Sequence, residues 1–198
     1  MFIRDFRNSF SVKEVLFATM KFFYFSIIFL IPFLGDSQTL AEVRKKFHIA
    51  VLDPEKSEEF HDFLKNTALT TPTMKAYKAS SEAMFARAVW NPFTKLSQVM
   101  KYSDLMEVAV EEDEENAEIR FLRFAIEYNL PRFLGMSKHQ DEDLEAIVSN
   151  ATSISSMNLD ESFCRYIIYF LKDTGLSTKE DMEKMETAFS SAGYSATN

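Results

Sequence analysis

The sequence predicts an all-α fold of stacked antiparallel helical hairpins, about eight helices in all, after an N-terminal signal segment. The 198 residues include only 4 Gly and 5 Pro, whereas β-sandwiches and barrels need both residues at many tight turns. Apolar residues recur at helical spacings of three and four along most of the chain. With 46% hydrophobic residues and 20 Phe, the chain can bury one sizeable core, so we expect one folded domain.

The N-terminal end has the order of a secretion signal. Met20 and Lys21 precede an apolar stretch, 22–34, and the small residues Gly35 and Ser37 follow it. A basic start, an apolar core and small residues before the cut are the three parts of a signal peptide. We therefore predict that residues 1–37 are a signal peptide cleaved between Ser37 and Gln38, and that Met20 is its true start because the leader before it is unusually long.

An uncleaved N-terminal anchor is the alternative for the same segment. The apolar core alone is shorter than the roughly 20 residues that a membrane span requires. Extending it back to Val15 gives that length but buries Lys21. In both cases we expect an exported protein, either periplasmic or secreted. Any attachment to a membrane is then confined to this N-terminal segment.

The first half of the domain predicts two hairpins. A helix over about 40–51 is followed by Asp53-Pro54, a cap and first-turn proline that start a second helix ending near Leu64. The polar stretch 66–73 is a loop. Helices over 74–89 and 92–110 follow, and we interpret Trp90 at their corner as an aromatic plug that closes the turn between packed helices.

The helix that begins near Asn116 is the most informative. Apolar side chains cover most of its circumference and leave only a narrow polar stripe, so we expect it to lie centrally. Further helices are predicted over 140–150, 160–173 and 178–191. The folded domain then covers 38–192, and 193–198 form a loose tail.

One stretch also resembles a known repeat. Residues 102–125, from Tyr102-Ser103-Asp104-Leu105 through the acidic run 111–115 to Ala125, are similar to the second helix and inter-repeat turn of a tetratricopeptide repeat. The usual turn proline is replaced by Glu114, and no second copy follows at a fixed spacing. The chain as a whole resembles small exported helical proteins of Bacteroidetes, a resemblance that implies no particular activity.

Charge and composition exclude several classes of function. Residues 1–37 contain four basic and three acidic residues, so the mature chain keeps 18 basic and 27 acidic residues, a net charge of −9. An acidic chain without a basic stripe is not expected to bind nucleic acid, and we expect it to contact a membrane only through the N-terminal segment, if that is uncleaved. The four Gly cannot form a phosphate-binding loop, and the three His lack the spacing of a helical zinc site. We expect no cofactor, metal or catalytic residues, and a buried inert thiol at Cys164.

Arg120 and Arg123 are the candidate partner-binding residues. In the structural interpretation, Arg123 pairs with Glu127 one turn on and Arg120 pairs with an acidic residue of another helix. In the functional interpretation, the two arginines form a fork for a partner's carboxylate. We expect an exported scaffold that binds a peptide or protein partner. The alternative is an enzyme, or a small-ligand or lipid carrier with a site between helices.

Overall fold

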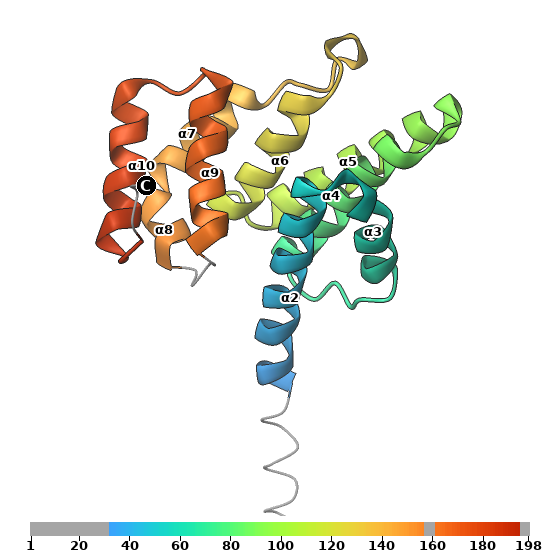
Figure 1. Ribbon diagram of the computed structural model, residues 1–198, viewed down its shortest axis with the longest axis horizontal. Coiled ribbons are helices and arrows are strands. Elements are labelled where there is room, and N and C mark those ends of the chain that lie inside the picture. The colour runs from blue at the N-terminus through green and yellow to red at the C-terminus, as the bar shows by residue number, and fades with distance from the viewer. Residues whose placement is uncertain (1–31, 157–160, 195–198) are drawn as a thin grey trace, which may run out of the picture. The chain divides into compact units, whose positions relative to one another are not determined.

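The computed structural model describes residues 32–156 and 161–194, with side chains described for 40–153 and 161–194. These residues form nine α-helices, two 3₁₀ helices and no β-strand (Figure 1), which confirms the all-α fold class. In chain order the elements are α2 (Pro32–Leu52), η1 (Pro54–Lys56), α3 (Ser57–Lys65), α4 (Pro72–Ala88), α5 (Pro92–Glu112), α6 (Ala117–Asn129), η2 (Arg132–Leu134), α7 (Gln140–Ser149), α8 (Ala151–Ser156), α9 (Glu161–Thr174) and α10 (Lys179–Ser191).

The chain divides into two compact units, Met1–Leu40 and Ala41–Asn198. Of the first unit, only the backbone from Pro32 onward lies in the described range. The predicted cleavage position between Ser37 and Gln38 falls in this backbone, within α2, and the predicted start at Met20 lies outside the described residues. None of the helices in the described ranges is both long and apolar enough to cross a bilayer. Signal cleavage stays a prediction.

Capping side chains set the helix boundaries of the second unit. The Asp53 carboxylate accepts from the Glu55 backbone N–H at 3.1 Å, and Pro54 is the first residue of η1, as predicted. Asn91 accepts from the N–H groups of Phe93 and Thr94 at the start of α5. Thr178 and Asp181 form a capping box at the start of α10. Each cap satisfies N–H groups that have no partner inside the helix.

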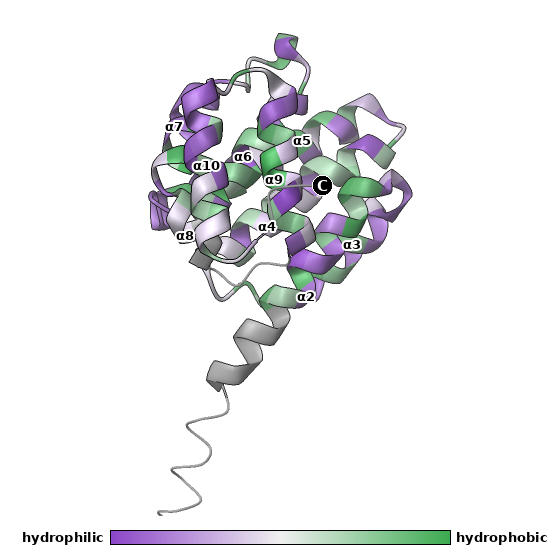
Figure 2. Ribbon diagram, turned by 60° about the vertical axis from the view of Figure 1, so that its left-hand side comes forward, coloured by the Kyte–Doolittle hydropathy of each residue, from purple (hydrophilic) through white to green (hydrophobic). Residues whose placement is uncertain are grey.

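The central position predicted for the helix near Asn116 is confirmed. That helix, α6, packs against α4, α5, α7, α8 and α9. Phe121 and Phe124 are completely buried, and the Phe121 ring packs edge-on against Phe163 and Phe170 at centroid distances of 6.2 and 5.9 Å. Figure 2 shows hydrophobic residues along α6, which packs against both α4 and α9, and hydrophilic residues along the outer turns of α7. Cys164 is buried in the same core.

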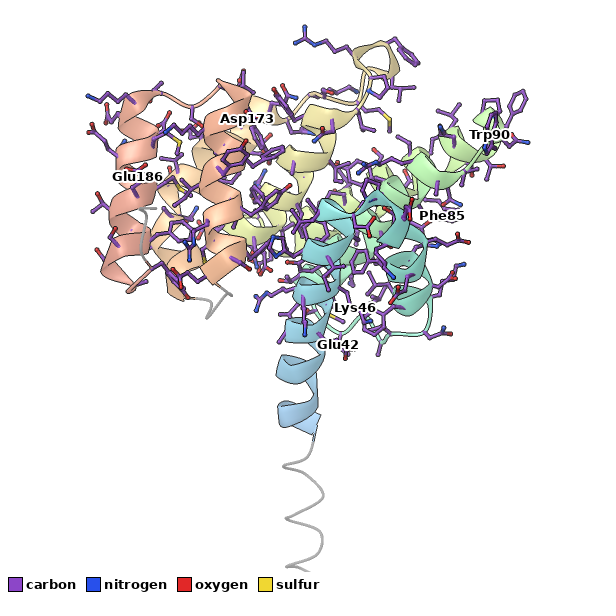
Figure 3. All side chains as sticks on the ribbon, viewed as in Figure 1. Glu42, Lys46, Phe85, Trp90, Asp173 and Glu186 are labelled. Atoms are coloured by element: carbon purple, nitrogen blue, oxygen red, sulfur yellow. The ribbon has the colours of Figure 1, made fainter. Side chains whose placement is uncertain are left out.

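The interpretation of Trp90 as a packed plug is wrong. Its side chain is 98% exposed and lies at the far end of the α4–α5 hairpin (Figure 3). The turn is closed without it, because Asn91 caps α5 and Pro92 occupies its first turn. Two short elements, α8 and η2, were also not predicted.

The last helix ends in a defined turn. The N–H of Tyr194 donates to the Phe189 carbonyl at 3.0 Å, and Gly193 has a positive φ of 89°. The Tyr194 ring packs on Phe189 with a centroid distance of 6.1 Å. Gly193 and Tyr194 therefore cap α10 in the manner of a Schellman turn, and the rest of the predicted tail, 195–198, lies outside the described residues.

Candidate functional site

The two candidate arginines lie side by side on α6 and face one carboxylate of α7. Arg123 donates to both oxygens of Asp143, from Nε at 2.8 Å and from Nη2 at 2.6 Å. Arg120 donates to Asp143 from Nη1 at 3.1 Å and from Nε to the Glu114 carbonyl at 2.8 Å. Glu142, also on α7, accepts from both arginines. Two guanidinium groups thus meet two carboxylates, and the cluster is locally neutral.

The cluster is buried, so it differs from an open binding site. Arg120 is 7% exposed, Arg123 is 4% exposed and Asp143 is completely buried. Burial raises the pKa of Asp143, and hydrogen bonds from the two arginines oppose that effect. The Arg120 hydrogen bond lowers the pKa of Glu142. In the functional interpretation the two arginines form a fork for a partner's carboxylate, and here the chain's own Asp143 occupies that position.

The predicted pairing of Arg123 with Glu127 is replaced by another contact of Glu127. One Glu127 oxygen accepts from the backbone N–H groups of Lys138 and His139 at 3.0 and 3.1 Å, and the other lies 2.8 Å from His139 Nδ1. The Ser137 hydroxyl donates to the Glu127 backbone carbonyl at 2.7 Å. Glu127 therefore clamps the end of the loop that leads into α7.

A cavity of about 360 Å³ lies beside this clamp. Its walls come from α5, from α6 and from the loop before α7, and include Tyr102, Ser103, Glu107, Glu127 and His139. The lining combines carboxylates, an imidazole and hydroxyls, which is a donor and acceptor set suited to a small polar ligand.

A second buried ionic cluster was missed in the sequence. Arg44 of α2 donates to both oxygens of Glu118 of α6, each at 2.7 Å, and the Tyr77 hydroxyl of α4 donates to the same carboxylate at 2.7 Å. Glu118 is 1% exposed. Burial, followed by the adjacent Glu118 charge, raises the pKa of Tyr77 well above its ordinary value. This cluster ties three helices together and leaves no open position for a ligand.

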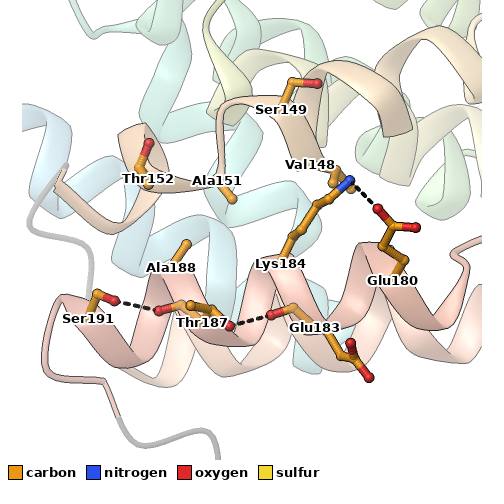
Figure 4. Close-up of a pocket in the computed structure, with 10 residues that line it drawn as sticks. All are labelled: Val148, Ser149, Ala151, Thr152, Glu180, Glu183, Lys184, Thr187, Ala188 and Ser191. Atoms are coloured by element: carbon orange, nitrogen blue, oxygen red, sulfur yellow. Dashed lines mark hydrogen bonds and ion pairs between the residues drawn. The ribbon is translucent and has the colours of Figure 1, made fainter.

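An open groove of about 680 Å³ runs between α10 and the end of α7 with the start of α8 (Figure 4). Val148, Ala151 and Ala188 provide apolar lining, and Glu180 and Glu183 provide acidic lining. The two α10 hydroxyls that line the groove are already satisfied, since Thr187 donates to the Glu183 carbonyl and Ser191 to the Thr187 carbonyl. Lys184 pairs with Glu180 at 3.0 Å. The groove thus offers apolar and acidic surface, with no reactive group.

Within the described side chains, no group of three or more His, Cys, Asp or Glu residues is arranged to hold a metal ion. Comparisons with protein-family models, with curated proteins and with solved structures found no match for this chain. The structure therefore defines only a broad class of protein. It is an all-α protein in which ion pairs between arginines and carboxylates hold its own helices together. The tetratricopeptide resemblance of residues 102–125, which here span the end of α5 and the start of α6, stays a prediction.

Proposed function

We propose that this chain is an exported helical scaffold that binds a peptide or protein partner in the groove beside α10. The observation that carries the proposal is the groove itself, an open hollow with an apolar floor between two helical segments. A surface of this kind suits an extended or helical segment laid along it. Arg120 and Arg123 have no direct part in this contact, because both are buried against Asp143.

The charge of α10 defines the chemistry of the partner. The helix carries Glu180, Asp181, Glu183 and Glu186 against two lysines, which pair with Glu183 and Glu180, so α10 keeps a net negative charge. Glu183 and Glu186 are exposed along one side of it, where they line a second hollow that adjoins the groove. Opposite charges across an interface favour association and select against like-charged partners. The partner segment is therefore basic, with apolar side chains that reach the floor.

Peptides matched in length and apolar content, with net positive, zero or negative charge, test the proposal. Fluorescence anisotropy should detect binding of the positive peptides, and this binding should weaken as salt is added. The double variant Glu183→Lys/Glu186→Lys should lose it. The matched control is Glu111→Lys/Glu115→Lys, in an equally exposed acidic run. Equal binding by both variants would exclude the groove as the site.

Export is the second part of the proposal. It is supported by the order of basic, apolar and small residues before Gln38. N-terminal sequencing of exported protein tests it directly, with Gln38 expected as the first residue. A membrane-bound product that still begins at Met20 would favour the anchor.

The cavity beside Glu127 favours a second candidate function, a small-ligand carrier or an enzyme. Its polar walls enclose about 360 Å³, which is enough for a small polar molecule. A thermal-shift screen with small polar compounds tests this, since a ligand that binds the folded state raises the melting temperature. Filling the cavity with Ser103→Phe should remove that shift. A shift that persists in this variant would place the ligand elsewhere.

A further inference from the structure

The far end of the α4–α5 hairpin is an exposed apolar surface. We name it the aromatic corner and define it as Trp90, Phe93, Leu96 and Met100. Trp90 is 98% and Phe93 83% exposed, and Leu96 and Met100 are exposed as well. Phe93, Leu96 and Met100 follow at spacings of three and four residues, so they share one face of α5. Large apolar side chains gathered on a soluble surface commonly mark a site of interaction.

The charged residues that flank the aromatic corner in the sequence are all positive. No Asp or Glu occurs between Glu82 and Asp104, whereas Arg87, Lys95 and Lys101 lie in that interval, and all three are exposed. This composition contrasts with the acidic excess of the rest of the mature chain. At a rise of 1.5 Å per residue, Glu82 lies roughly 9 Å from the end of α4, and Asp104 lies roughly 16 Å along α5 from Phe93 and one turn beyond Met100. The charged residues nearest to Trp90 and Phe93 along the two helices are therefore Arg87 and Lys95. Physiological salt screens exposed charges over about 8 Å, so the local field is set by the basic residues.

The shape of the corner excludes a groove for a peptide. Trp90 projects from the end of the hairpin (Figure 3), and the nearly full exposure of Trp90 and Phe93 indicates a convex surface. Tryptophan and phenylalanine at a convex tip fit the headgroup level of a bilayer, where an aromatic ring sits between apolar and aqueous phases. Neighbouring Lys and Arg side chains are attracted to anionic lipids.

We infer that the aromatic corner is a second contact site that inserts Trp90 and Phe93 into the surface of an anionic lipid membrane, with Arg87, Lys95 and Lys101 on the headgroups. This goes beyond the binding of a peptide beside α10 and is independent of it. It also revises the expectation, based on net charge alone, that the chain touches a membrane only through its N-terminal segment. Net charge averages over the whole surface, and the corner has the opposite sign.

Trp90 is the only tryptophan of the chain, so its fluorescence in the full-length protein reports on the corner itself. The probes are vesicles of phosphatidylcholine with phosphatidylserine and vesicles of phosphatidylcholine alone. With the anionic vesicles, Trp90 emission should shift to the blue, and lipids brominated on the acyl chain should quench it. Because the readout is local, it stays valid even if the N-terminal segment holds the chain on both kinds of vesicle.

Two triple variants complete the experiment. Arg87→Gln/Lys95→Gln/Lys101→Gln should weaken the partitioning of Trp90 into anionic vesicles by about a hundredfold, since each of the three basic residues contributes roughly a fivefold effect. The matched control, Lys138→Gln/Lys172→Gln/Lys179→Gln, removes the same charge from exposed positions elsewhere and should leave the shift unchanged. Phe93→Ser should reduce the shift, whereas Tyr169→Ser, at an exposed position of α9, should not.

Three results would overturn the inference. One is Trp90 emission that stays at the wavelength of exposed tryptophan while the chain sediments with anionic vesicles. Another is a missing dependence on charge, seen as equal blue shifts with both kinds of vesicle or as an equal loss in both triple variants. The third is a blue shift with an acidic amphipathic peptide but with neither vesicle, which would assign the corner to a protein partner.

Discussion

Arg44 and Glu118 lie 74 positions apart in the sequence, and two parallel hydrogen bonds of 2.7 Å join the guanidinium of one to the carboxylate of the other. The pair is bidentate, a geometry in which an arginine is more strongly oriented than a lysine would be. The Tyr77 hydroxyl completes the shell of the carboxylate. Helices α2, α4 and α6 are therefore held in register by a single acidic side chain.

Removing that carboxylate should be costly. Glu118→Ala leaves Arg44 and the buried Tyr77 hydroxyl without their acceptor, and breaking a buried pair on one side costs about 3 to 5 kcal/mol. Chemical denaturation followed by circular dichroism measures the free energy of unfolding. Glu115→Ala, three positions earlier and exposed, is the control and should change it by less than about 0.5 kcal/mol. Similar values for the two variants would contradict the structural role of Glu118.

The Arg123–Asp143 pair gives a second prediction. Arg123→Ala removes two hydrogen bonds of Asp143, which has no exposed surface, and leaves Arg120 as its remaining arginine partner. The substitution should lower the free energy of unfolding by about 1.5 to 3 kcal/mol. The double variant Arg123→Met/Asp143→Leu replaces the pair with apolar side chains of similar size and should recover most of the loss. If the double variant did not recover stability, the loss in Arg123→Ala would be due to lost packing and not to the broken ion pair.

The aromatic core gives a third prediction. Phe121→Ala or Phe124→Ala empties a fully buried site and should cost about 3 to 5 kcal/mol in the free energy of unfolding. Phe133→Ala is the matched control, because that ring is 87% exposed and its removal leaves no cavity. If both core variants stayed within about 0.5 kcal/mol of the parent, α6 would be peripheral.

The dependence of stability on pH should reveal His61. Its ring is buried between α3 and α4, stacks on Phe85 at a centroid distance of 4.3 Å and has Nε2 3.1 Å from a Glu82 oxygen. Burial lowers the pKa of His61 despite the opposing effect of Glu82, and Lys78 and Lys65 act in the same direction as burial. The unfolded chain therefore takes up this proton at a higher pH than the folded chain. Stability is full above about pH 6.5 and falls as the pH drops below that value.

Comparison with His61→Asn isolates this effect. Between pH 7.5 and 5.5, the free energy of unfolding of the parent should fall more steeply than that of the variant, which has no proton to gain at this position. Parallel curves over this range would show that His61 does not cause the loss.

The sequence was sufficient wherever a local pattern determines the structure. Asp53-Pro54 and Asn91-Pro92 begin helices because a capping side chain and a proline act within one turn, and α6 is central because its apolar residues surround it. Trp90 was misplaced because a corner sequence does not say toward which side its side chain turns. The helix α8 was missed because Ala151–Ser156 contains four Ser or Thr residues and only one large apolar residue, too few for a helical period.

The ionic clusters could not be paired from the sequence. A helix suggests partners three or four residues away, so Arg123 was assigned to Glu127, whereas the carboxylate that it binds lies 20 positions along the chain. Arg44 and Glu118 are even further apart. The sequence indicated these ion pairs only indirectly. An arginine and a glutamate occupied otherwise apolar helix faces, and burying either charge without a partner would be costly.

The hydrogen bonds of the Glu127 clamp join the two ends of the loop before α7, so that the loop is closed at its base. The loop leaves α6 just after Glu127 and is fastened back to that residue at 137–139, while Pro131, Arg132 and Phe133 between these points are exposed. Extra residues inserted there lengthen the loop without shifting α7, and the entropy cost of a longer loop grows slowly. An epitope tag inserted between Pro131 and Arg132, just before η2, would thus give the protein an internal label.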